Sequence, residues 1–384
     1  MQTATIAAAA VGPAAPLFRL GHMFINPLFD YLVIGGGLSL LAGILLWSQG
    51  VVLGLGAGAL LYVFLISNNA HFAASTVRLY TRPGATRALP LVTLALPVAA
   101  LVAATTAIVV PEPAGMLLFA TYLIWSPYHY SAQAYGLAVM YAYRSGADLH
   151  APDKQLIRAA CLAPFLWTVL QPQGGMAMVV ARLGLTPVPA LEPLRAVVSA
   201  VLSTLTLLAP LLVFIALRRR AGVTLPAISV LVIASNAVWW TLFNYLDAFV
   251  WAAVFHGLQY LAIVTIFHVK DRLRRPGHTR SWRFHTVAFY GTCVALGYLL
   301  FEAWPAVYGL AGLDVTRSVL LVTATINIHH FIVDAFIWRL RKDPNYRNVV
   351  DDTLPLPDRR PGGGEALATG RAEQAIVQRD ELEG

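Results

Sequence analysis

Long apolar runs alternate along the chain with short polar stretches that hold most of its charged residues. Runs of this length are typical of helices that cross a membrane, because a helix satisfies its backbone hydrogen bonds internally in lipid. The sequence therefore predicts an all-α, polytopic integral membrane helical bundle with about ten transmembrane helices. The predicted spans are residues 31–47, 51–74, 89–110, 115–141, 156–170, 196–217, 225–243, 249–268, 286–301 and 318–338.

The basic residues between these spans predict the orientation of the bundle. If the N-terminus lies in the cytoplasm, nearly all loop arginines and lysines fall on the cytoplasmic side, and only Arg182, Arg195 and Arg317 fall on the other. Cytoplasmic loops of membrane proteins show this asymmetry, and an odd number of spans would remove it. We therefore predict that both termini are cytoplasmic, and we expect the protein in a bacterial inner membrane.

The composition agrees with a membrane protein and argues against a nucleic-acid partner. Hydrophobic residues make up 58% of the chain and charged residues 12%, against about 25% charged in soluble domains. The net charge of +8 comes mostly from loops that would face an anionic leaflet. We therefore expect the lipid bilayer as a partner and no nucleic acid.

Three regions differ in character along the chain. Residues 1–27 are predicted to be a flexible N-terminal lead, because the first 17 are alanine-rich and uncharged. Residues 28–342 form the predicted transmembrane domain. Residues 343–384 are predicted to be a disordered cytoplasmic tail, because the stretch is rich in proline, glycine and charge.

Histidines occur inside four of the predicted spans. An ionisable side chain at bilayer depth is costly, so such residues usually mark a functional site. The four spans are even-numbered and run in the same direction in the predicted topology. We therefore predict that they meet and hold a metal ion or a haem. The candidate ligands are His71, His129, His256, His329, His330 and Asp334.

The residue types favour a redox metal. Neutral imidazole binds iron, copper and zinc, and two histidines with one carboxylate suit non-haem iron and dioxygen. Asp334 lies one helical turn after His330. Neither cysteine is near a histidine, which disfavours iron–sulfur clusters and structural zinc. Polar residues near the histidines are expected to orient the ligands: Asn68, Gln133, Gln259, Asn327, Tyr130 and Tyr260.

The depths of the histidines in the membrane do not decide whether they form one metal site or two. Measured from the next basic residue, His71 and His330 differ in depth from His129 and His256 by about 8–12 Å. A kink at Pro127, or helices that project past the bilayer, would close this gap, and otherwise the histidines form two sites.

A multi-span membrane protein with histidines scattered through its helices resembles the Brp/Blh-type β-carotene dioxygenases. That resemblance implies a non-haem iron held by His71, His129, His256 and His330, and an oxygenase acting on a lipophilic substrate that enters from the bilayer. An electron donor or partner subunits would then complete the reaction.

Other functions stay open at this point. The adjacent pair His329–His330 resembles the copper-site pair of haem–copper oxidases, whose remaining pattern is missing here. The histidines also suit a haem-binding electron-transfer subunit, or a proton-coupled transporter in which they and Asp334 relay protons. A structural subunit would use the same residues only as hydrogen bonds between helices.

Overall fold

The structure is a computed structural model that describes residues 18–49, 57–185, 189–338 and 349. Regular structure within these residues is entirely helical. The chain divides into two units at Val350, and the second unit, Asp351–Gly384, lies outside the described residues. The predicted tail at 343–384 therefore lies outside them too, apart from Val349.

The helices succeed one another with short connections, and η denotes a π-helical or 3-10 turn. In chain order they are α1 (Pro27–Phe29), η1 (Asp30–Ile34), α2 (Gly37–Gln49), α3 (Ala57–Phe64), η2 (Leu65–Asn69), α4 (Ala70–Thr81), α5 (Ala85–Ala88), η3 (Leu91–Ala95), α6 (Leu96–Val109), η4 (Pro111–Gly115), α7 (Met116–Arg144), α8 (Ala151–Val169), α9 (Gly175–Arg182), η5 (Pro189–Leu191), α10 (Glu192–Ala221), α11 (Ala227–Leu242), α12 (Tyr245–Leu273), α13 (Trp282–Tyr298), η6 (Leu299–Ala303), α14 (Trp304–Leu310) and α15 (Val315–Ile337).

Several helices are long and apolar enough to cross a membrane. The described residues contain five of them, and a sixth if Pro27–Ile34 and Gly37–Ser48, which meet at 55°, form one bent span. The all-α prediction is confirmed for the described residues, and these helices fit an integral membrane bundle. The five are Leu91–Val109, Pro189–Arg220, Tyr245–Leu273, Trp282–Leu310 and Val315–Ile337.

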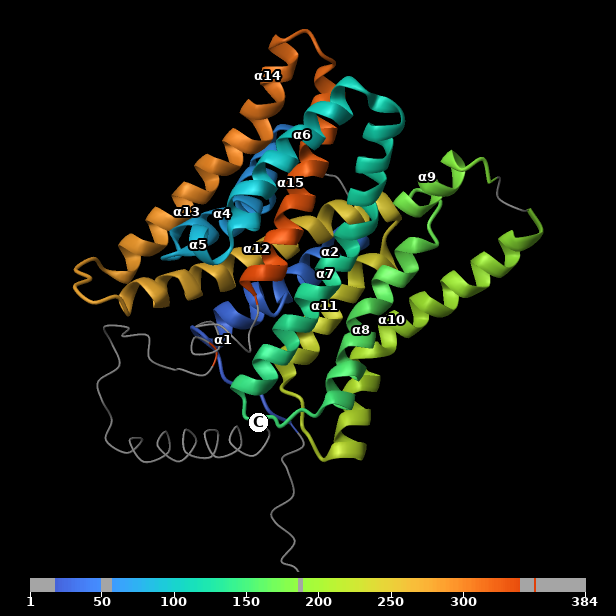
Figure 1. Cartoon of the computed structure of the whole chain (residues 1–384). Coiled ribbons are helices and arrows are strands. Elements are labelled where there is room, and N and C mark those ends of the chain that lie inside the picture. The colour runs from blue at the N-terminus through green and yellow to red at the C-terminus, as the bar shows by residue number, and fades with distance from the viewer. Residues whose placement is uncertain (1–17, 50–56, 186–188, 339–348, 350–384) are drawn as a thin grey trace, which may run out of the picture. The chain divides into compact units, whose positions relative to one another are not determined.

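Four helices pack around a common centre. α15 contacts α4 and α7, and α12 contacts the same two helices. Figure 1 shows α12 running obliquely across α15 rather than alongside it. α8 and α10 pack together beyond α7, and α13 covers the outer side of α4. The centre is therefore enclosed by helices that are far apart in the sequence.

A glycine makes the bend between η1 and α2. Gly36 has a φ of +83°, which lies in the left-handed region that favours glycine. A β-carbon at this position would also collide with the side chain of Ser235 on α11. The bend brings Ser39 to Trp239, whose indole Nε1 donates to the Ser39 Oγ at 2.7 Å. The bend at Gly36 thus allows the start of α2 to pack against α11.

The segment before α1 is packed against the bundle through Asp30. The Asp30 carboxylate accepts a hydrogen bond from the Tyr141 hydroxyl at 2.9 Å. It also accepts hydrogen bonds from the backbone N–H groups of Phe24 (2.5 Å), Ile25 (3.0 Å) and Asn26 (3.3 Å). Phe24 is buried. Residues 24–26 at the end of the predicted lead at 1–27 are thus held against Asp30, while residues 1–17 lie outside the described residues.

Candidate metal centre

Four histidines from four helices meet at the centre of the bundle. His71 comes from α4, His129 from α7, His256 from α12 and His330 from α15. Ring centroids lie 4.9 Å apart for His71–His330, 5.1 Å for His71–His256 and 5.0 Å for His129–His330. His71, His256 and His330 are buried, and the His129 side chain is 11% exposed.

The histidines therefore form one cluster and not two. The depth estimate from the sequence assumed parallel helices, on which a position along the chain measures depth. Because α12 runs obliquely to α15 (Figure 1), that assumption fails for His256. Helix α7 continues through Pro127 as one helix, so His129 reaches the cluster without a break in the helix at Pro127.

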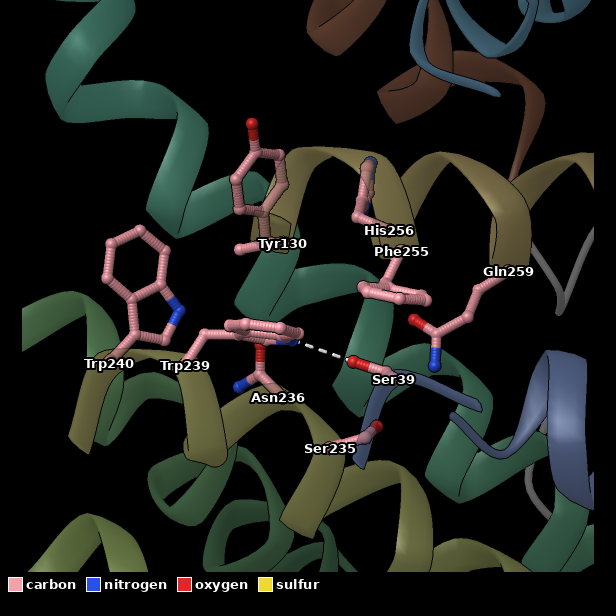
Figure 2. Close-up of a pocket in the computed structure, with 10 residues that line it drawn as sticks. Ser39, Tyr130, Ser235, Asn236, Trp239, Trp240, Phe255, His256 and Gln259 are labelled. Atoms are coloured by element: carbon pink, nitrogen blue, oxygen red, sulfur yellow. Dashed lines mark hydrogen bonds between the residues drawn. The ribbon is translucent and has the colours of Figure 1, made fainter. Parts of the chain in front are cut away.

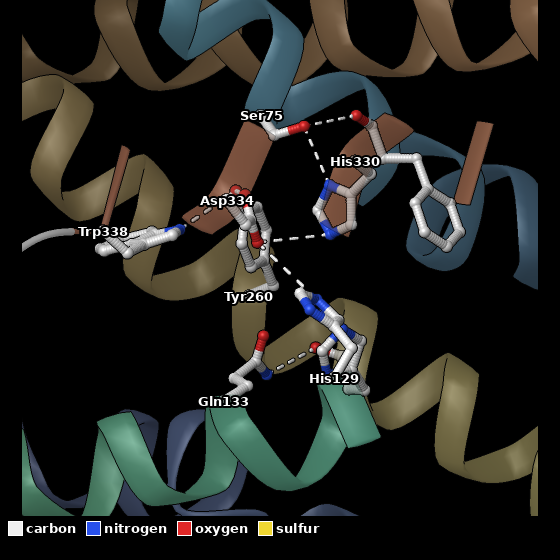
Figure 3. A network of polar contacts seen from close by, with 9 residues as sticks. Ser75, His129, Gln133, Tyr260, His330, Asp334 and Trp338 are labelled. Atoms are coloured by element: carbon white, nitrogen blue, oxygen red, sulfur yellow. Dashed lines mark hydrogen bonds and ion pairs between the residues drawn. The ribbon is translucent and has the colours of Figure 1, made fainter. Parts of the chain in front are cut away.

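Asp334 adds a carboxylate to the cluster. Its Oδ2 lies 3.4 Å from the His330 Nε2 and 3.7 Å from the His129 Nε2 (Figure 3). In the part of the chain that the structure describes, two groups have their ligand atoms within 4.8 Å of one another: His71 with His256 and His330, and His129 with His330 and Asp334. His330 belongs to both groups, so it lies at the middle of the candidate site.

Most of the imidazole nitrogens that face this centre are buried without a hydrogen-bond partner among the described residues. Among the described residues, no hydrogen-bond partner is present for the Nε2 of His129, His256 or His330, or for either nitrogen of His71. A buried polar atom left unsatisfied costs about 1–3 kcal/mol. A bound cation would accept one lone pair from each neutral imidazole, so the donor set fits a metal ion.

Ser75 fixes the orientation of the His330 ring. The His330 Nδ1 lies 2.9 Å from the Ser75 Oγ, and the Ser75 hydroxyl can donate to the Phe72 carbonyl at 3.0 Å (Figure 3). With that donation made, the Ser75 oxygen accepts the Nδ1–H of His330, which leaves the Nε2 lone pair facing the centre. Ser75 was not among the residues expected from the sequence, although it lies four residues after His71 and on the same helix face.

His71 is placed by a widened turn and by a glycine. The π-helical turn η2 ends two residues before His71, and such turns are frequent at functional sites. Gly257 on α12 faces this turn: a β-carbon there would lie 3.0 Å from the His71 Nδ1 and 3.1 Å from the Ser67 carbonyl oxygen. The absence of a side chain at Gly257 therefore lets α12 approach His71 closely.

Tyr260 holds the second oxygen of Asp334. The buried Tyr260 hydroxyl donates to the Asp334 Oδ1 at 2.7 Å, while Oδ2 faces the histidines. The Trp338 Nε1 donates to the Tyr260 oxygen at 3.4 Å. Tyr260 therefore lies beside the centre, as expected of an orienting residue, although it orients the carboxylate and not an imidazole.

Tyr130 and Gln133 of α7 support His256 in different ways. The Tyr130 ring lies 4.5 Å from the His256 ring, at an interplanar angle of 39°. The Gln133 Nε2 donates to the His256 backbone carbonyl at 3.2 Å and not to its imidazole. Gln133 thus joins α7 to α12, and Tyr130 packs against the candidate ligand.

The other expected orienting amides do not bond to an imidazole in the structure. The Gln259 Nε2 donates to the Ile34 carbonyl at 3.1 Å, and the Asn327 Nδ2 donates to the Thr323 carbonyl on its own helix at 2.8 Å. The buried Asn68 Oδ1 has no partner among the described residues. The spacing placed these side chains near the histidines in sequence without giving the direction of their hydrogen bonds.

His329 stays apart from the cluster. It is only partly buried and belongs to neither candidate ligand group among the described residues. Adjacent residues on a helix differ in direction by about 100°. Since His330 faces the centre, His329 faces another side of α15.

A small cavity lies on the other side of α12. Its volume is about 20 Å³, which is room for about one water molecule. Figure 2 shows the rings of His256 and Tyr130 directed away from Ser39 and Ser235, which line it. His256 and Tyr130 also line this cavity, so it adjoins the histidine cluster on the side of α12 that faces α11.

No protein-family model, no curated protein and no solved structure matches this chain. The resemblance to the Brp/Blh-type dioxygenases therefore stays a prediction from the sequence. A function for this chain has to be inferred from the residues of the centre itself.

Proposed function

We propose that the protein is an integral membrane, metal-dependent oxidoreductase that uses non-haem iron. One observation carries the proposal: buried imidazole nitrogens without a hydrogen-bond partner among the described residues lie in two adjoining groups of candidate ligands, which share His330 and include the Asp334 carboxylate. The group of His129, His330 and Asp334 has the two-histidine, one-carboxylate composition that suits iron(II) and dioxygen. His71 and His256 would complete the ligand set.

The surroundings of the centre favour a lipophilic substrate. Phe331 stacks on the His129 ring with centroids 4.4 Å apart, and Trp125 lies 5.7 Å from Phe331. These aromatic side chains offer an apolar wall beside a candidate ligand. An unsaturated, isoprenoid-like molecule taken up from the bilayer has the matching chemistry, so we propose a substrate of this class.

The proposed topology has ten spans with both termini in the cytoplasm. It is supported by the one-sided distribution of arginine and lysine in the loops. In a bacterial inner membrane, the loops rich in arginine and lysine would face the cytoplasm, as is usual for such loops. Cysteine accessibility labelling of loop positions from each side of the membrane tests the topology.

Metal analysis of the purified protein tests the function. The detergent-purified chain is expected to bind about one iron per molecule, and the His330→Ala variant is expected to lose it. His278→Ala is the control, because His278 is exposed and lies outside both candidate ligand groups. Iron content that survives substitution of His71, His129, His256 and His330 together would overturn the proposal.

The same preparation separates the alternative functions. A Soret absorption band would indicate a haem-binding electron-transfer subunit. Stoichiometric copper in place of iron would indicate that the oxidoreductase uses copper. pH-dependent uptake into vesicles without any bound metal would favour a proton-coupled transporter. Oxygen consumption with a polyene or isoprenoid, dependent on His330, is the result expected of the oxidoreductase.

A further inference from the structure

We propose that Tyr260 is a redox-active residue of this centre, which supplies one electron and one proton during turnover. The inference rests on the proposed function, because it needs a metal that changes oxidation state. It goes further by assigning chemistry to a side chain that does not belong to the candidate ligand groups.

A single carboxylate joins the phenol to the centre. The Tyr260 hydroxyl donates to the Asp334 Oδ1 at 2.7 Å, and the Oδ2 of the same group lies 3.4 Å from the His330 Nε2. The Tyr260 ring also lies edge-on to two candidate ligands, with centroids 5.3 Å from His330 and 5.6 Å from His71. Tyr260 is therefore in contact with the centre through a hydrogen bond and through two rings.

Trp338 determines where the phenolic proton goes. Its Nε1 carries a hydrogen and can only donate, so the Tyr260 oxygen accepts at 3.4 Å from that side. The phenolic hydrogen is then directed at Asp334 (Figure 3). This places a proton acceptor on the phenol before any electron moves.

These contacts allow a balanced one-electron, one-proton step. A redox metal held by these ligands would supply a one-electron oxidant after reaction with dioxygen. Tyr260 would give up one electron to it, and the Tyr260 O–H bond would break as the proton passes to the Asp334 Oδ1. The step would leave a neutral tyrosyl radical and a protonated Asp334 carboxyl group, with the oxidant reduced by one electron.

Trp338 also provides the route for regeneration. It lies at the C-terminal end of α15, it is partly exposed, and its ring centroid is 5.9 Å from that of Tyr260. A one-electron donor that reaches Trp338 can return an electron to the radical, while Asp334 returns the proton. The centre is thereby connected to an external reductant without opening it to water.

The chain contains a matched control for this pair. Tyr141 is also buried, and its hydroxyl donates to the buried Asp30 carboxylate at 2.9 Å. Asp30 accepts backbone N–H groups and lies in neither candidate ligand group. Tyr141 thus has the same hydrogen-bonded chemistry without the metal centre.

Freeze-quench electron paramagnetic resonance tests the inference. Purified protein is loaded with iron(II), exposed to dioxygen and frozen, and iron content is measured in each sample. A tyrosyl radical is expected in the wild type and in Tyr141→Phe, and it should be absent in Tyr260→Phe at equal iron content. Ring-deuterated tyrosine should narrow the signal.

A second variant keeps the test decisive if Tyr260→Phe does not fold. Trp338→Phe removes the N–H group from the phenol oxygen, so it should shift the g-tensor of a radical on Tyr260. A radical that persists in Tyr260→Phe, or is unchanged in Trp338→Phe, overturns the inference. Iron that binds and is oxidised without any radical overturns this inference alone, whereas failure to bind metal overturns the proposed function as well.

Discussion

The Nδ1 of His330 lies 2.9 Å from the Oγ of Ser75, and these two residues are 255 positions apart in the chain. The contact joins α4 to α15 and presents the Nε2 of His330 to the centre. It therefore determines which nitrogen of the most central imidazole is free to bind an ion.

Substitution of Ser75 should weaken the metal site without removing a ligand. Ser75→Ala deletes the acceptor of the His330 Nδ1–H, and loss of such a contact typically lowers metal affinity by about 10–100-fold. Competition with a chelator on the purified protein measures this change. Ser229→Ala is the control, because the buried Ser229 hydroxyl donates to the Ala138 carbonyl and to no residue of the candidate ligand groups; an equal loss in both variants would contradict the assignment.

Asp334→Asn should distinguish the two candidate ligand groups. The variant keeps an oxygen for the Tyr260 hydroxyl but loses the charge that would bind a cation. If His129, His330 and Asp334 bind the ion, iron affinity should fall by at least about tenfold. Unchanged iron binding would instead assign the ion to His71, His256 and His330.

His329→Ala and His330→Ala should behave differently although the residues are adjacent. His330 belongs to both candidate groups and His329 to neither. Elemental analysis should therefore find iron retained in His329→Ala and lost in His330→Ala. The reverse result would show that α15 presents another face to the centre.

Gly257→Ala should disturb the site through van der Waals contact alone. The added β-carbon would lie 3.0 Å from the His71 Nδ1, so the ring or the helix must move. Overpacking of this kind costs about 1–3 kcal/mol, and we expect weaker iron binding and a lower Tm. Gly136→Ala is the matched control: nothing lies within 4 Å of its added carbon, and alanine is the better helix former.

Asp30→Asn should destabilise the fold and leave the metal site intact. The buried carboxylate accepts three backbone N–H groups and the Tyr141 hydroxyl. Hydrogen bonds to a charged group contribute about 1.5–3 kcal/mol each, so a loss of this order is expected. Thermal unfolding in detergent measures it, with Asp148→Asn as the exposed control; iron stoichiometry should not change.

The all-helical fold and the residues that meet at the centre could be predicted from the sequence for a physical reason. Charged and polar side chains are so costly in an apolar bundle that each one is informative. This argument indicates His71, His129, His256, His330 and Asp334, and it indicates His329 equally, although His329 belongs to neither candidate ligand group among the described residues. Tyr260 and Tyr130 could be added because each lies close to a histidine in the chain.

The geometry of the centre could not be predicted in the same way. Ser75 on α4 contacts His330 on α15, which lies far away in the sequence. Gly257 affects the site only because η2 and α4 pack closely against it. Gln259 bonds to the Ile34 carbonyl, which no spacing within its own helix could indicate. Such contacts depend on crossing angles between helices, and these angles result from packing over the whole bundle.

The effect of chain length on the centre depends on the widened turn η2. A π-helical turn accommodates one residue more than a regular turn, whereas each residue added to a regular turn rotates the rest of the helix by about 100°. Deleting one residue from Leu65–Asn69 would restore a regular turn and leave α4 facing nearly the same way, because the widened turn has absorbed that residue. Deleting one residue between His71 and Ser75 would instead rotate Ser75 about 100° away from the face of His71, so the consequence of a deletion in this stretch depends on which turn loses the residue.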